Sequence, residues 1–131
     1  MNRIDPKLAA TLRQPHELVE AGLAPVAALA ELEQVAARYA VAVTPELVAL
    51  IDPADPADPI ARQFIPSADE LVEQPGENVD PIGDDAHSPI AGIVHRYPDR
   101  VLFKLVHVCA VYCRFCFRRE MVGPGKATAL S

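Results

Sequence analysis

Apolar residues in the N-terminal part of the chain recur at helical spacing. In "APVAALAELEQVAARYA" they lie three or four positions apart, at Val26, Leu29, Leu32, Val35 and Ala36. This spacing places them on one helical face, and Pro25 suits the first turn because its missing N–H would have no partner there. "TPELVALI" repeats the pattern in shorter form, with Thr44 as the N-cap and Pro45 after it. We therefore predict a helical N-terminal region over residues 1–51.

The helical pattern stops at "DPADPADPI", residues 52–60. Each proline disfavours helical dihedral angles at the aspartate before it, so the repeat should form turns or extended chain. Acidic, proline-rich sequence continues from there, with ten acidic residues and a single basic residue, Arg62, between Asp52 and Asp85. We predict a solvated connecting segment over residues 52–90 that has little regular structure and wraps along a folded body.

A change to β-branched and aromatic residues follows at residues 91–108. "GIVHRY" and "RVLFKLVHV" are separated by "PD", which predicts a short strand, a tight turn and a long strand. The long strand would lead directly to Cys109, and its apolar residues on both faces are typical of a strand that is covered on both sides. A third region, residues 91–131, therefore begins with these strands, and the predicted fold class is α/β.

Charge is unevenly distributed along the chain. The 131 residues carry a formal net charge of −6, yet the part from Arg96 onward is mainly basic. This favours a pocket for anions over a nucleic-acid surface, since no long basic stripe is present. The first residues lack the apolar core of a secretory signal, and no stretch is long enough to cross a bilayer. We expect no membrane contact and a cytoplasmic location, where thiols stay reduced.

All three cysteines of the chain lie within eight residues, at Cys109, Cys113 and Cys116. Three interpretations are open. The spacing fits one face of a helix, on which cysteine packs as a small apolar residue. The thiols could instead bind zinc, with His107 or His95 as the fourth ligand. The third interpretation is a cubane iron–sulfur cluster, because three thiolates without a fourth would leave one iron open to a substrate or cofactor.

The cysteine loop, with Phe115 just before the last cysteine, resembles the signature loop of the radical S-adenosylmethionine enzymes. Within that superfamily, "DPIARQFIPSADEL", "DPIGDDAHSPIAGIVHRYPDRVLF" and "CAVYCRFCFRR" are similar to lysine 2,3-aminomutase and its relatives, including the isomerase that makes β-lysine for elongation factor P. The resemblance covers residues 52–131 well and the first 50 residues only in general character. It implies a (β/α)-barrel isomerase that interconverts L-lysine, or a related amino acid, and its β-isomer. The reaction would proceed through a 5′-deoxyadenosyl radical and a pyridoxal phosphate imine.

The resemblance also implies roles for residues of the loop. Cys109, Cys113 and Cys116 would hold a 4Fe–4S cluster whose open iron binds S-adenosylmethionine. Phe115 would lie near the adenine of that cofactor. The arginines close to the cysteines, including Arg114, would lower the thiol pKa values and offset the charge of the cluster.

Three arginines take the remaining roles that the resemblance implies. Arg118 would grip the carboxylate of the substrate, a task suited to a planar two-pronged donor. Arg96 and Arg100 would meet the phosphate of pyridoxal phosphate. Simpler interpretations stay open, because Arg118 and Arg119 could neutralise a cluster, and Arg96 and Arg100 could flank a hairpin turn. Phe117 matches the elongation factor P branch, so the choice of amino acid is left open.

The chain is expected to be the N-terminal portion of such an enzyme. A (β/α) barrel needs about 200 residues or more, and residues 91–131 would supply one strand and its loop. We therefore expect a truncated barrel that is inactive alone. The expected partners are an amino acid substrate and a low-potential electron donor, with a homo-oligomer for the full-length enzyme and no nucleic acid. The competing class is a small zinc-binding module whose "YCRFCFRR" contacts nucleic acid or protein.

Overall fold

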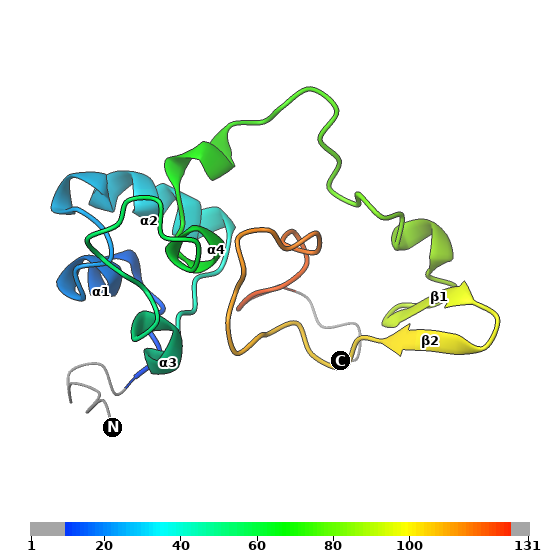
Figure 1. The fold of residues 1–131 in the computed structure, drawn as a ribbon. Coiled ribbons are helices and arrows are strands. Elements are labelled where there is room, and N and C mark those ends of the chain that lie inside the picture. Colours follow the sequence, from blue (N-terminus) through cyan, green and yellow to red (C-terminus); the bar gives the residue numbers. More distant parts are fainter. Residues whose placement is uncertain (1–9, 127–131) are drawn as a thin grey trace. The chain divides into compact units, whose positions relative to one another are not determined.

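The computed structural model describes residues 10–126 of the chain (Figure 1). These residues divide into two units. The described residues up to Glu73, together with Cys109–Cys116, form the first unit. Gln74–Val108 and the described residues from Phe117 onward form the second unit. The outer ends of the predicted N-terminal and C-terminal regions lie outside the described residues.

Short helices provide the regular structure of the first unit. They are α1 (Pro15–Glu20), the 3₁₀ turn η2 (Val26–Ala28), α2 (Leu29–Arg38), α3 (Pro45–Val48), α4 (Ala61–Phe64) and the 3₁₀ turn η3 (Ala68–Leu71). The predicted helix after Pro25 is confirmed as η2 and α2. Val26 is 74% exposed, because the tighter 3₁₀ turn rotates it away from the face that buries Leu32 and Val35. The shorter predicted helix is confirmed as α3, which begins after Thr44.

The core of the first unit joins α1 and α3 to the extended segments before α1 and after α2. Leu12 and Val43 form an isolated antiparallel bridge, in which each amide nitrogen lies 2.9 Å from the partner's carbonyl oxygen. Leu18, Val41 and Val48 complete the buried cluster. Full burial of an aliphatic side chain is worth about 1.5–3 kcal/mol. These contacts stabilise helices that are too short to be stable by themselves.

The acidic repeat forms consecutive turns, as predicted. Asp52, Asp55 and Asp58 each accept a hydrogen bond, at 2.8–2.9 Å, from the backbone nitrogen two residues later. Such side-chain bonds to the backbone are typical of turns that begin with aspartate. Asp58 departs from the predicted solvated segment, because it is buried and also accepts hydrogen bonds from the amides of Asp52 and Ala61. It thereby closes the repeat into a loop.

The second unit contains the 3₁₀ turn η4 (Asp85–His87) and a two-stranded antiparallel sheet of β1 (Ile93–Tyr97) and β2 (Arg100–Phe103). The predicted tight turn joins the two strands, and Ile93 lies opposite Phe103 in the register. With the helices of the first unit, this hairpin confirms an α/β composition. None of the helices between residues 10 and 126 has the length and apolarity needed to traverse a bilayer.

The prediction of a long second strand is wrong. The amide of Lys104 donates to the carbonyl oxygen of Gly92 at 2.7 Å, and the ladder ends there. Beyond this bond, the described residues offer no strand to pair with residues 105–108, and extended chain without a ladder partner does not form a sheet. All four residues of β2 are exposed. The predicted cover on both faces is therefore absent from the described part of the chain.

Candidate functional site

The three cysteines lie on an irregular loop of the first unit, Cys109–Cys116, which contains neither helix nor strand. Cys109 and Cys113 are exposed, Cys116 is half-buried, and all three thiols are free. The interpretation as one face of a helix is therefore wrong.

Tyr112 fixes the loop at its centre. It is only 5% exposed, and its amide donates to the carbonyl oxygen of Ala42 at 3.3 Å. Its hydroxyl oxygen accepts a hydrogen bond from the amide of Cys109 at 3.2 Å. The backbone at the first cysteine is thus tied to the segment that follows α2.

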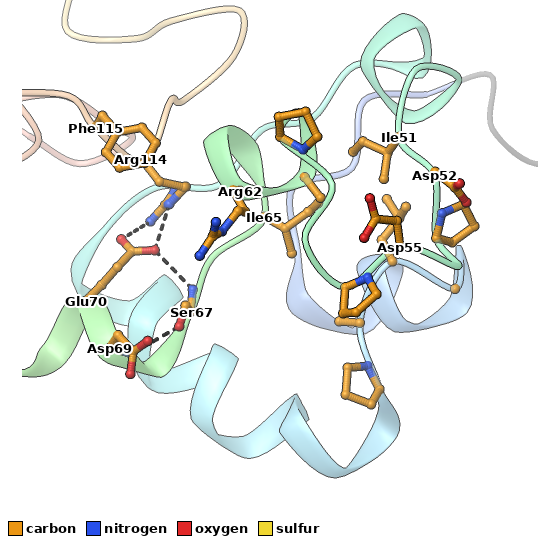
Figure 2. Close-up of a pocket in the computed structure, with 18 residues that line it drawn as sticks. Ile51, Asp52, Asp55, Arg62, Ile65, Ser67, Asp69, Glu70, Arg114 and Phe115 are labelled. Atoms are coloured by element: carbon orange, nitrogen blue, oxygen red, sulfur yellow. Dashed lines mark hydrogen bonds and ion pairs between the residues drawn. The ribbon is translucent and has the colours of Figure 1, made fainter.

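Arg114 provides the second attachment of the loop (Figure 2). Its Nε and Nη2 donate to the two carboxylate oxygens of Glu70 at 2.9 and 2.6 Å. Its Nη1 donates to the carbonyl oxygen of Ala40 at 2.8 Å, and its amide donates to Gln63 at 2.7 Å. Figure 2 also shows that Glu70 accepts the amide of Ser67, the first residue of a capping box. Sequence reasoning missed this second use of Glu70, although the capping box itself has a local signal.

Consecutive residues of the loop alternate between the interior and the surface. Tyr112 is buried, and the side chain of Arg114 is only 7% exposed. Cys113 is exposed between them, and Phe115 is 76% exposed. The loop therefore presents a thiol and an aromatic ring outward from a backbone that is held in place.

Burial and the neighbouring thiols both act on Cys113. Burial raises the pKa of the Cys113 thiol, and the neighbouring thiols of Cys116 and Cys109 raise this pKa further. The prediction that arginines lower the thiol pKa is wrong at Cys113, because the guanidinium of Arg114 is paired with Glu70 instead.

The donor chemistry of the loop fits an iron–sulfur cluster. Free thiols become stable thiolates when they bind a metal cation, because the positive charge favours the deprotonated form. In this structure, however, the three cysteine side chains do not surround a common position. Between residues 10 and 126, no group of three or more His, Cys, Asp or Glu side chains surrounds a common metal position.

The two histidines that we considered as zinc ligands belong to the second unit. His95 is an exposed residue of β1. His107 is buried, and its Nδ1 lies 2.9 Å from the carbonyl oxygen of Met121. The carbonyl oxygen of His107 also accepts the amide of Gly123. These contacts give His107 a structural role within the second unit.

The three arginines with predicted ligand roles line one cavity in the second unit. This cavity has a volume of about 240 Å³ and is lined by Arg96 from β1, Arg100 from β2 and Arg118. Arg100 is 71% exposed and paired with Asp99, to which its Nε and Nη2 donate at 3.0 and 2.6 Å. The structure thus brings together three residues that sequence reasoning had assigned to two different anionic groups.

Asp84 lies between two of these arginines and is only 1% exposed. Its Oδ1 accepts from Nη2 of Arg96 at 3.2 Å, and its Oδ2 accepts from Nε of Arg118 at 2.7 Å. The hydrogen bond from Arg118 is the main cause that holds the pKa of Asp84 below its ordinary value, and Arg96 adds to this effect. Sequence reasoning placed Asp84 in the connecting segment and missed it, because a partner 34 residues away gives no local signal.

Arg118 also contacts an aromatic ring, and the neighbouring Arg119 lies near a carboxylate of its own. Its guanidinium carbon lies 4.7 Å from the centre of the Phe117 ring, a cation–π distance. Nη2 of the neighbouring Arg119 lies 4.0 Å from Oε2 of Glu77. Arg118 is therefore restricted both by the carboxylate of Asp84 and by the ring of Phe117.

Comparisons with known proteins identify the sequence relatives. No protein-family model matches the chain. It is 48% identical over 82 residues to L-lysine 2,3-aminomutase of Clostridium subterminale, an alignment that covers 63% of this chain and 20% of the relative. It is 41% identical over 81 residues to L-lysine 2,3-aminomutase of Bacillus subtilis strain 168, with 62% and 17% covered. It is also 39% identical over 92 residues to glutamate 2,3-aminomutase of Clostridioides difficile strain 630, with 70% and 22% covered. The chain spans about a fifth of the length of these relatives. Over the matched residues, the chain is similar to these lysine and glutamate 2,3-aminomutases.

Proposed function

We propose that the chain is part of a radical S-adenosylmethionine aminomutase that interconverts an amino acid, L-lysine or a close relative, and its β-isomer. One observation carries this proposal: a loop with three free thiols is fixed at Tyr112 and Arg114 and presents Cys113 and Phe115 outward. The relatives named as lysine and glutamate 2,3-aminomutases support the reaction class.

Cys109, Cys113 and Cys116 would hold a 4Fe–4S cluster and leave one iron without a protein ligand. With S-adenosylmethionine on that iron, the cluster would supply a 5′-deoxyadenosyl radical. The exposed ring of Phe115 would contact the adenine, since a flat aromatic ring stacks well on a base. Tyr112 and Arg114 would hold the loop backbone while the thiol side chains turn toward the cluster.

Arg118 would bind the α-carboxylate of the amino acid. Its Nε is bonded to Asp84, and its two Nη groups donate no hydrogen bond within the described residues. This free end suits the two oxygens of a carboxylate. Arg96 and Arg100 would bind the phosphate of pyridoxal phosphate, the cofactor that would carry the amino group of the substrate.

We assign catalysis to a longer protein, because this chain spans about a fifth of the length of its relatives. That protein would complete a (β/α) barrel, form a homo-oligomer and accept electrons from a low-potential donor. The part described here would be inactive alone.

Anaerobic reconstitution with iron and sulfide tests the proposal. The chain should become brown and bind about four irons. Serine at Cys109, Cys113 or Cys116 should abolish this binding. Ala110→Ser, which adds a hydroxyl at an exposed position of the same loop, should leave it unchanged and serves as the matched control. A colourless chain that binds a single zinc ion would contradict the proposal and favour a zinc-binding module.

A further inference from the structure

We propose that Asp84 is a positioning residue: it is held by Arg96 and sets the orientation of Arg118 for binding a carboxylate in the cavity beside the hairpin. The inference rests on the proposed function for the nature of the ligand, an amino acid, and on the second unit alone for its geometry. Asp84 is 1% exposed, whereas the side chains of Arg96 and Arg118 are 32% and 28% exposed and line the cavity. A ligand in the cavity can therefore reach the two guanidiniums but not the buried carboxylate of Asp84 that holds them.

The two oxygens of Asp84 are divided between the two arginines. Oδ2 holds Nε of Arg118, which leaves the Nη1 and Nη2 end of that guanidinium without a hydrogen bond among the described residues. Oδ1 holds Nη2 of Arg96, which also donates to the carbonyl oxygen of Ile82 at 2.5 Å. A planar guanidinium that is held along one edge has a fixed direction for its remaining donors.

Asp84 is itself held firmly by its neighbours. Its amide donates to Oδ1 of Asp80 at 2.8 Å, and its carbonyl oxygen accepts from Oγ of Ser88 at 2.8 Å. The low pKa of the carboxyl keeps it ionised at neutral pH. Side chains that orient a binding group need such support to be effective.

The charges next to Arg118 favour the binding of a carboxylate. Arg100 is paired with Asp99, while Arg96 and Arg118 share the single carboxylate of Asp84. These two guanidiniums and one carboxylate carry one net positive charge, which a carboxylate ligand would neutralise.

Positioning and simple electrostatics predict opposite effects of Asp84→Asn. Removing a negative charge beside the cavity should strengthen the attraction for an anion. Releasing Nε of Arg118 should weaken anion binding, because the free guanidinium loses its fixed direction. The sign of the change therefore distinguishes the two accounts.

The experiment titrates the chain with acetate and follows the arginine Nε–H signals by NMR. The unaltered chain should show a distinct Arg118 signal that moves with acetate. Asp84→Asn should lose this distinct signal and bind acetate about tenfold more weakly. Asp84→Glu, which restores a carboxylate, should recover most of the affinity. Asp85→Asn removes the same charge at the exposed neighbouring residue and should leave the affinity unchanged.

Tighter or equal acetate binding by Asp84→Asn would overturn the inference, as would acetate binding that leaves the Arg118 signal unmoved. A second measurement uses only the unaltered chain, in case the variant does not fold. The Nε proton of Arg118 should exchange with solvent more slowly than that of Arg62, which is exposed and whose side chain makes no hydrogen bond within the described residues. Equal exchange rates would also overturn the inference. Acetate binding needs neither a cluster nor S-adenosylmethionine, so failure of the proposed function would not decide this test.

Discussion

Glu70→Gln should destabilise the first unit, because it leaves the guanidinium of Arg114 buried without an opposite charge. Both carboxylate oxygens of Glu70 accept from Arg114, at 2.9 and 2.6 Å, and the side chains of Glu70 and Arg114 are 12% and 7% exposed. Glutamine keeps the size of the side chain and an oxygen that can accept the Ser67 amide. The substitution therefore removes mainly the charge and one bond of the pair.

The structure suggests the size of the effect on the free energy of unfolding. Removing one partner of a buried ion pair costs about 3–5 kcal/mol. Arg114 keeps its hydrogen bond to the Ala40 carbonyl oxygen, so we expect the lower end, about 3 kcal/mol. The matched control is Glu73→Gln, since Glu73 is 77% exposed and lies 3.4 Å from Arg38. Glu73→Gln should lower the free energy of unfolding by less than about 1 kcal/mol.

Urea unfolding followed by circular dichroism measures both variants. Arg114→Met should also be destabilising, and the double variant should lose less stability than the sum of the two single losses, because it leaves no buried charge unpaired. Thiol modification should be faster at Cys113 in Glu70→Gln, since the loop loses one attachment. Equal losses of unfolding free energy for Glu70→Gln and Glu73→Gln would refute the reasoning that burial makes the Arg114–Glu70 pair stronger than the Arg38–Glu73 pair.

Two further predictions concern the rest of the first unit. Hydrogen bonds from backbone amides, that of Ala61 first, lower the pKa of Asp58. The ionised Asp58 carboxylate therefore stabilises the fold fully above the ordinary carboxyl pKa of about 4. This stabilisation is lost as the pH falls through the lowered pKa. Asp58→Asn should therefore lose less stability on acidification than the unaltered chain, and superimposable stability curves against pH would contradict this. Leu18→Ala, at a fully buried position, should cost about 2–5 kcal/mol in urea unfolding. Leu50→Ala, at a position 65% exposed, should cost below about 1 kcal/mol, and similar losses for both leucines would contradict the described core.

Local features of the fold could be predicted from the sequence. The apolar spacing after Pro25 predicted α2, and the pair Thr44 and Pro45 predicted the start of α3. The repeated aspartate–proline pairs predicted turns, since proline restricts the residue before it. These signals depend on neighbours within a few positions along the chain, so they could be recognised without a structure.

Features that depend on distant partners could not be predicted in the same way. The length of β2 is set by where β1 begins, and apolar composition alone does not reveal this limit. Arg114 was predicted to act on the thiols, whereas it pairs with Glu70, 44 residues earlier. Nothing in the sequence distinguished Asp84 from the other acidic residues of its segment. The structure shows that it accepts a hydrogen bond from Arg118. The cysteine loop could be proposed as a site from spacing alone, because its three cysteines lie within eight residues; its role as a cluster site stays a prediction.

The most direct test of the central claim, an iron that the three cysteines leave open, is the EPR spectrum of the reduced, reconstituted chain with and without S-adenosylmethionine. A ligand that binds the open iron changes the electronic environment of the cluster. The account predicts a cluster signal that shifts when S-adenosylmethionine is added and does not shift with methionine. A cluster signal that S-adenosylmethionine leaves unchanged would contradict the account.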